Sequence, residues 1–307
     1  MRTRLTLPPR FSFDAVVRSH GWYGLPPFRY EPEGGGTLTT VLGSGEISFR
    51  PRAGALVVSG AGLDRTALRA AAVRVFSLDL DLSAFDGALD GEPDLRRALT
   101  RGGGRMLRAP SVFEDAVKML LTTNCSWEAT RGMVTKLVTV AGEGGAAFPT
   151  PESLARLSPA ALRKKVRCGY RAEALSRFAR RVASGRLDLS AWEDRGRPPA
   201  EVRESILAEH GFGPYAAEGL LRILGRHDFL AIDSWMRKQY RRIHPGPART
   251  VDRAIARRYA RFGGFRGLAM WLELTRHWHE TSPPLVRGIC GRRPHRRAAR
   301  VCARPLA

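Results

Sequence analysis

Residues 200–240, AEVRESILAEHGFGPYAAEGLLRILGRHDFLAIDSWMRKQY, decide the fold. Their apolar spacing predicts two short amphipathic helices, over 200–209 and 214–225, on either side of Gly211-Phe212-Gly213. Because glycine adopts positive φ without strain, Gly211 and Gly213 predict a tight hairpin with uncovered backbone N–H groups. The second helix begins at Pro214, so its positive N-terminal end lies beside those amides. We expect the hairpin to hold a phosphate, directly or through a monovalent cation, and a simple corner of the core is the alternative.

One carboxylate, Asp233, follows this hairpin at a distance of about twenty residues. The apolar run Phe229 to Ile232 brings Asp233 to the start of a helix predicted over 234–243. There the carboxylate can cap the helix, which the residues alone favour, or it can face a ligand. Lys238 lies on the same helix, where it is a phosphate contact or a solvated side chain.

The rest of the chain predicts an α+β protein. Three short β-rich runs, Thr37–Leu42, Glu46–Arg50 and Ala55–Ser59, precede a helix over Thr66–Phe76. We expect an antiparallel β-rich N-terminal module over 1–100, then a flexible seam at 101–104 (RGGG), a mostly helical domain over 105–280 and a basic, disordered tail over 285–307. In the helical domain, a capping box at Ser111–Glu114 begins a helix that runs to about Thr123. The other helices are expected over 128–140, after Thr150 and Ser158, and over 171–184, 250–262 and 265–279.

The charge of the chain indicates an anionic partner. Its 307 residues carry 51 Lys and Arg against 29 Asp and Glu, a formal net charge of +22. Residues 1–100 hold 12 arginines and 11 acids, so +21 of this charge lies after residue 100. Nucleic acid fits such a field better than an acidic membrane, since no long basic amphipathic helix stands out. No apolar run reaches the ~20 residues of a membrane-spanning helix, and the opening MRTRLTLPPR is a poor secretion signal.

The cysteines and histidines do not indicate a metal site. Cys125, Cys168, Cys290 and Cys302 contain no CxxC pair, which excludes a zinc ribbon and a compact iron–sulfur spacing. His277 and His279 stand two residues apart, so on a helix they point to different sides. We therefore expect no metal, no iron–sulfur cluster and no cofactor apart from the cation at the hairpin.

With these motifs, residues 105–280 resemble the helix-hairpin-helix (HhH-GPD) DNA glycosylase superfamily, in which an aspartate at the place of Asp233 is essential to base excision. SVFEDAVKMLLTTNCSWEATRGMVTKLV resembles the helical pair that, in the 8-oxoguanine branch, supplies an asparagine facing the unpaired base, and Asn124 holds that place. LRKKVRCGYRAEALSRFARRV resembles the wedge segment of the family, with Tyr170 and Arg171 in its turn, and YARFGGFRGLAMWLEL resembles the closing helix. Residues 1–100 loosely resemble the small β-rich module of the family.

Two departures from the family pattern bear on the reaction and the substrate. Bifunctional members carry a lysine where this chain has Tyr215, so strand cleavage through a Schiff base is not expected. The glutamine and phenylalanine that the 8-oxoguanine branch places around its base fall at Met270 and Leu274, which puts 8-oxoguanine in doubt. The alkylated-purine branch stacks cationic bases on electron-rich rings, and Tyr215, Trp235 and Trp127 could serve in this way or simply belong to the core.

These features favour a monofunctional DNA N-glycosylase of base-excision repair that removes an alkylated or oxidised purine. Asp233 would stabilise the oxocarbenium-like transition state and activate water. We expect its partner to be double-stranded DNA with a damaged base, and the protein to be a monomer in the cytoplasm, at the nucleoid. The alternatives are a non-catalytic protein of this fold that binds kinked or damaged DNA, and a bifunctional glycosylase/lyase with another amine.

Overall fold

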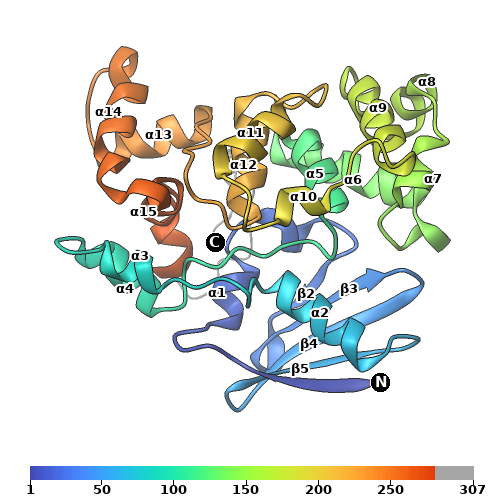
Figure 1. Ribbon diagram of the computed structural model, residues 1–307, viewed down its shortest axis with the longest axis horizontal. Helices are drawn as coiled ribbons and strands as arrows, with labels where there is room; N and C mark the ends of the chain where they lie inside the picture. The colour runs from blue at the N-terminus through green and yellow to red at the C-terminus, as the bar shows by residue number, and fades with distance from the viewer. Residues whose placement is uncertain (281–307) are drawn as a thin grey trace, which may run out of the picture.

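The sheet of the N-terminal module has five antiparallel strands in the order β1-β5-β4-β3-β2. The computed structural model describes residues 1–280 (Figure 1). The strands are β1 (Arg2–Thr6), β2 (Arg29–Glu31), β3 (Thr37–Leu42), β4 (Gly45–Arg52) and β5 (Ala55–Gly60). The three predicted strands correspond to β3, β4 and β5, whereas β1 and β2 were not predicted. β1 has a single buried residue, Leu5, so its own sequence carries little apolar alternation and its pairing with β5 defines it.

Fifteen α-helices follow or flank this sheet within the described residues, and the part after residue 100 is mostly helical. They are α1 (Phe13–Val17), α2 (Arg65–Val75), α3 (Ser83–Gly87), α4 (Pro93–Thr100), α5 (Val112–Thr122), α6 (Trp127–Ala141), α7 (Pro151–Ala155), α8 (Pro159–Ala161), α9 (Arg171–Ala183), α10 (Ser190–Glu193), α11 (Pro199–Leu207), α12 (Pro214–Ile223), α13 (Ser234–Ile243), α14 (Val251–Tyr259) and α15 (Arg266–Glu280). The α+β fold class predicted from the sequence is confirmed.

Side-chain caps explain why several of these helices begin where the sequence predicts. Ser111, Thr150 and Ser158 each accept a hydrogen bond from a backbone N–H of the first turn. The capping box at Ser111 is only half present, however. The Glu114 side chain does not return to the backbone of Ser111, because it is buried and accepts a hydrogen bond from Lys118 Nζ at 2.6 Å.

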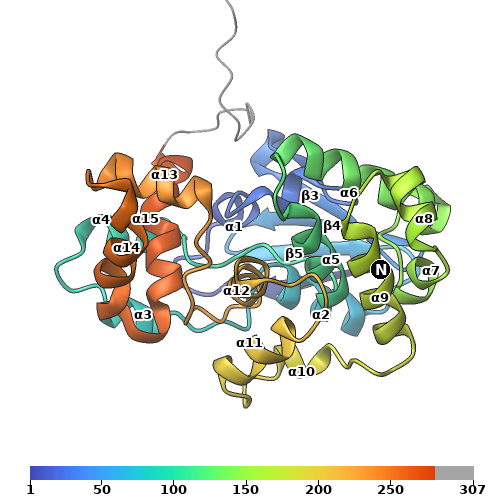
Figure 2. The ribbon, with the colours of Figure 1, turned by 90° about the horizontal axis from the view of Figure 1, so that it is seen from above.

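Two hydrophobic clusters form the interior. The first joins the buried face of the sheet to α2, α5, α9 and α12, and includes the stacked rings of Phe13 and Phe76 at 5.2 Å. The second joins α3 and α4 to α13, α14 and α15. In Figure 2, α12 lies between the helices of the second cluster and the helices α5 to α9. The chain between α12 and α13 therefore crosses from the first cluster to the second.

The glycine run at residues 101–104 is packed, so the prediction of a flexible seam is wrong. Gly102, Gly103 and Gly104 are buried. A Cβ on Gly102, whose φ is +91°, would lie 2.4 Å from Ser12 Cβ. The run is a tight turn between α4 and the segment before α5, and glycine is needed there for lack of space.

No helix within residues 1–280 has the length and apolar character needed to cross a membrane. The predicted tail over 285–307, with Cys290 and Cys302, lies outside the described residues.

Candidate functional site

The hairpin predicted from Gly211 and Gly213 connects α11 to α12, and its two glycines have different roles. Gly211 has φ +96°, and a Cβ there would lie 2.4 Å from the Cβ of Ala174 on α9. Gly213 caps α12 with extended backbone (φ −85°), so the expectation of positive φ at this residue is wrong. A Cβ on Gly213 would meet nothing within 4 Å, and no side chain caps the helix. The first-turn N–H groups of α12 therefore lie beside an open approach, which suits a phosphate oxygen.

Asn124 and Tyr170, predicted on different segments, meet at the surface. Asn124 Nδ2 donates a hydrogen bond to Tyr170 Oη over 3.2 Å. Asn124 adopts φ +47° in the turn after α5, and Tyr170 directly precedes α9. Tyr170 is 64% exposed and, with Met1, is a large hydrophobic residue left exposed in the described part of the chain. An exposed aromatic held by a neighbour is suited to insertion between bases.

Arg171, predicted as a DNA contact, is instead a buried support for this pair. Its guanidinium donates to the carbonyl oxygens of Thr123 and Cys168 and lies 4.6 Å from the centre of the Tyr170 ring. Thr123 directly precedes Asn124, so Arg171 holds the backbone on which Asn124 stands and also packs against Tyr170. Its hydrogen-bonding groups are directed to the protein interior, since the side chain tethers two loops.

Asp233 caps α13, as the residues alone favour, and keeps one oxygen for other contacts. Its Oδ1 accepts a hydrogen bond from the N–H of Met236 at 2.7 Å. Oδ2 has no hydrogen-bond partner among residues 1–280. The carboxylate is partly exposed at the point where the two hydrophobic clusters meet. The cap orients the carboxylate at the positive end of α13.

Glu218, which the sequence analysis missed, anchors the segment that carries Asp233. Its Oε2 accepts from the N–H of Ala231 at 2.9 Å, and its Oε1 accepts from Arg203 Nε and Nη2 at 3.0 and 2.9 Å. Ala231 is fully buried with φ +52°, an unfavourable conformation for a residue with a side chain. The available signal was a carboxylate one helical turn after Tyr215, on a helix whose other residues are mostly apolar.

Tyr215 and Arg222 lie two turns apart on α12 and both face the region of Asp233. Burial raises the pKa of Tyr215, and the charge of Asp233 raises it further. Burial lowers the pKa of Arg222 to about 10, against the opposing influence of Tyr215 and Asp233. Arg222 was also missed, although an arginine in the apolar run of α12 was a visible signal. Tyr215 and Arg222 therefore form one electrostatic group with Asp233.

The other predicted base-contacting residues are not all brought to this group. Trp235 lies next to Asp233, and its ring centre is 6.3 Å from that of Trp271 and 5.6 Å from that of Trp278. Trp127 instead packs against Gly21, where a Cβ would lie 2.4 Å from its ring. Met270 and Leu274 are fully buried in the second hydrophobic cluster, because they occupy the inner face of α15.

The lysines differ sharply in accessibility. Lys238 is exposed on α13, where it can reach a phosphate. Lys118 is fully buried, pairs with Glu114 and lies 4.9 Å from the centre of the Phe28 ring. A buried, paired ammonium is not available as a nucleophile, so Lys118 does not replace the lysine absent at Tyr215.

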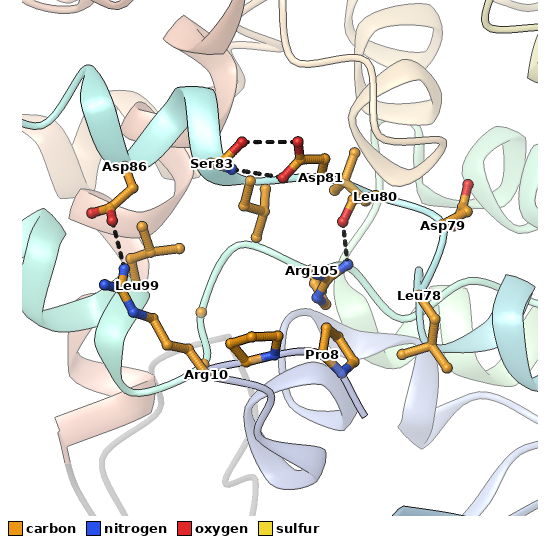
Figure 3. A pocket seen from close by; sticks show the side chains of 14 residues that line it. Pro8, Arg10, Leu78, Asp79, Leu80, Asp81, Ser83, Asp86, Leu99 and Arg105 are labelled. Carbon is orange, nitrogen blue, oxygen red and sulfur yellow. Dashed lines mark hydrogen bonds and ion pairs between the residues drawn. The ribbon is translucent and has the colours of Figure 1, made fainter. Parts of the chain in front are cut away.

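A pocket of about 490 Å³ lies elsewhere, and none of the predicted site residues lines it (Figure 3). Its wall includes Asp79, Asp81 and Asp86, with Arg10 paired to Asp86 at 2.6 Å. Arg105 also lines it, so the three aspartates face two arginines and the wall is not the strongly basic surface that a polyanion favours. Within residues 1–280, no group of His, Cys, Asp and Glu side chains is arranged to hold a metal ion.

Part of the chain matches one known protein family. Residues 117–268 match the family described as "HhH-GPD superfamily base excision DNA repair protein". Curated relatives from two strains of Mycobacterium tuberculosis, described as probable bifunctional transcriptional activator/DNA repair enzyme AlkA, are 29% identical over 251 residues, or 76% of this chain and 49% of theirs. The chain thus spans about half the length of these relatives.

Two solved structures share the fold. The 8-oxoguanine glycosylase/lyase of Clostridium acetobutylicum superposes with a TM-score of 0.70 at 18% identity, covering 89% of this chain and 95% of that chain. The 3-methyladenine DNA glycosylase of Archaeoglobus fulgidus superposes with a TM-score of 0.69 at 24% identity, covering 90% of this chain and 99% of that chain. The resemblance predicted from the sequence is confirmed.

Proposed function

We propose, from the match of residues 117–268 to the HhH-GPD superfamily, that this chain is a monofunctional DNA N-glycosylase acting on a damaged purine. The observation that carries the proposal is the free oxygen of Asp233, held beside Tyr215 and Arg222 on the helix that the hairpin begins. The family supports base-excision repair as the process. The absence of strand cleavage and the choice of a purine as substrate are parts of this proposal that the experiments below test.

The proposed reaction needs the damaged nucleotide outside the duplex, because its glycosidic bond is not reachable inside the stack. Tyr170 would enter the gap while Asn124 faces the unpaired base opposite, and the hairpin at Gly213 would hold one phosphate. Asp233 Oδ2 would then face the sugar, stabilise its developing positive charge and orient the water that attacks C1′. The base leaves with the electron pair of the glycosidic bond, and a proton from water passes to solvent.

The absence of lyase activity is proposed from the residues near Asp233. Tyr215 occupies the position of the lysine that bifunctional relatives use, and a phenol cannot form an imine with the sugar. Lys118 is buried in its pair with Glu114, and Lys238 lies on the helix after Asp233. The product would therefore be an uncut abasic site.

Asp233→Asn tests the catalytic role. Asparagine is as good an N-cap as aspartate, so the variant keeps α13 and removes only the charge. We expect the purified wild-type protein to release a damaged base from an oligonucleotide duplex, and the variant to bind the same duplex without release. Release by the variant at the wild-type rate would overturn the assignment. Release by neither protein, with tight binding by both, would favour the alternative of a damage-binding protein.

Borohydride trapping tests whether the protein lacks lyase activity. Incubation of the wild-type protein with damaged duplex and borohydride should give no covalent adduct, and the abasic product should break only on heating in alkali. A trapped adduct would establish a bifunctional enzyme. Trapping with Lys238→Gln would then show whether that exposed amine is responsible.

Double-stranded DNA is proposed as the partner on the basis of charge. Most of the net charge lies after residue 100, and α13 carries Lys238, Arg241 and Arg242. Contacts of this kind release counterions, so binding should weaken steeply as salt rises. Base release from an already saturated complex should change much less with salt. A salt-independent affinity would refute the proposed phosphate contacts.

A further inference from the structure

Arg222 is a buried cation without hydrogen-bond partners at the proposed site. Its side chain is 5% exposed, and neither Nε nor Nη1 has a hydrogen-bond partner among residues 1–280. It forms no ion pair with Glu218 or Asp233, whose carboxylates are bonded elsewhere. Burying a guanidinium without hydrogen-bond partners is strongly destabilising, which a purely structural role would not justify.

The other buried arginines of the described chain are satisfied. They donate to backbone carbonyl groups or carboxylates: Arg105 to Ser77 and Leu80, Arg108 to Ile223 and Asp79, Arg171 to Thr123, and Arg226 to Trp192 and Arg197. Arg226 lies only four residues after Arg222, just beyond the end of α12. The exception at Arg222 is therefore a property of its position and not of arginines in this fold.

The surroundings of Arg222 leave its donors for a ligand. Its Cζ lies 4.2 Å from the centre of the Trp271 ring, so the cation occupies one face of that indole. Burial and the positive charge of Arg222 lower the pKa values of His20 and His227 to about 3, which keeps both rings neutral, and neither nitrogen of His227 has a hydrogen-bond partner among residues 1–280. His20 Nε2 is already bonded to the Leu107 carbonyl oxygen at 2.7 Å.

We propose that Arg222 donates hydrogen bonds to a carbonyl oxygen of the everted base, so that the site selects neutral oxopurines over cationic alkylated purines. This inference rests on the proposed glycosylase function and names its substrate class. A guanidinium fork fits the O6 and N7 acceptors on one edge of hypoxanthine, and it can donate to the O6 or O8 carbonyl oxygen of 8-oxoguanine, whose N7 carries a hydrogen. A cationic base would instead lie next to the positive charge of Arg222. It could not stack on the face of the Trp271 indole that Arg222 already covers.

The charge balance supports the same selection. Without Arg222, the carboxylate of Asp233 would attract a cationic base. The positive charge of Arg222 interacts with Asp233 and opposes that attraction. A neutral base then gains from hydrogen bonds, whereas a cation without a carbonyl oxygen, such as 3-methyladenine, gains nothing from Arg222.

Arg222→Met tests this inference, with Arg226→Met as the matched control. Single-turnover release would be measured for hypoxanthine, 8-oxoguanine and 3-methyladenine, together with the thermal unfolding temperature of each protein. We expect Arg222→Met to slow release of the oxopurines by about 10- to 100-fold, to leave 3-methyladenine release unchanged or faster, and not to lower the unfolding temperature. Arg226→Met should lower the unfolding temperature, because it breaks satisfied contacts, without changing the ratio between the bases.

Arg222→Lys keeps the charge but not the fork, and should reduce the preference for oxopurines to an intermediate value. The inference is overturned if Arg222→Met slows all bases equally, or if the wild-type protein releases 3-methyladenine and no oxopurine. In the latter case, loss of 3-methyladenine release with Asp233→Asn would leave the proposed function standing. Release of no base by the wild-type protein would overturn the function and this inference together.

Discussion

Replacing Glu218 with alanine should slow base release without changing Asp233, the proposed catalytic carboxylate. Glu218 accepts the Ala231 N–H at 2.9 Å and two N–H groups of Arg203, so Glu218→Ala leaves donors on both sides of it unpaired. Loss of a buried hydrogen bond to a charged group costs about 1.5–3 kcal/mol. Ala231 has φ +52°, a conformation that costs about 1–2 kcal/mol. Without the hydrogen bond to Glu218, Ala231 can relax from this conformation.

We therefore expect Glu218→Ala to lower the free energy of unfolding by about 2 kcal/mol, measured by urea denaturation. Relaxation at Ala231 moves Asp233, which is two residues further on. A displacement of about 1 Å can slow a positioned reaction about 100-fold, which single-turnover base release would detect. Affinity for abasic duplex should stay within about twofold, since the hairpin and Tyr170 are unchanged.

Two further variants test whether Glu218 positions Asp233. Glu218→Gln retains an oxygen that can accept the Ala231 N–H, so most of the release rate should survive. Glu204→Ala removes another carboxylate from Arg203, bonded at 3.0 Å but exposed, and should leave both stability and release near wild type. Equal losses from Glu204→Ala and Glu218→Ala, or wild-type release by Glu218→Ala, would refute the positioning role.

Three further predictions concern the hairpin, the exposed tyrosine and acid stability. Gly211→Ala should lower the free energy of unfolding by about 2 kcal/mol or more, since Gly211 has φ +96°. Gly213→Ala should fold normally, yet fluorescence anisotropy should show weaker binding to duplex DNA. The opposite pattern would contradict the geometry of the hairpin. Tyr170→Ala, a change at an exposed residue, should alter stability by less than about 0.5 kcal/mol and slow release from duplex but not from single-stranded DNA. An equal loss on single strands would argue against insertion. Burial lowers the pKa of His227 from 6.5 to about 3, so between these pH values only the unfolded chain binds a proton at this residue. The neutral, buried His227 therefore makes its full contribution to stability above pH 6.5. The free energy of unfolding should fall by about 1.4 kcal/mol for each pH unit as the pH decreases toward 3. Urea denaturation over this range should show a shallower pH dependence for His227→Leu, and an unchanged slope would refute the assignment.

The sequence by itself determined the features that depend on neighbouring residues. Pro214 after Gly213, the serine and threonine caps and the aspartate before Ser234 predicted helix starts that the structure reproduces, because caps act within one turn. The same local pattern carried the family resemblance, which the match over residues 117–268 confirms. The catalytic and DNA-binding roles assigned to these residues remain predictions for the experiments above.

Only the tertiary structure decided which side chains lack partners and which are held in place. Arg171 turned inward because Thr123, distant in sequence, offers its carbonyl oxygen, and the glycine run at 101–104 packs because Ser12 lies against it. The anchoring of Ala231 by Glu218 and the unpaired guanidinium of Arg222 likewise depend on contacts between elements far apart along the chain. Such contacts have no local signature, since burial and hydrogen bonding are properties of the assembled interior.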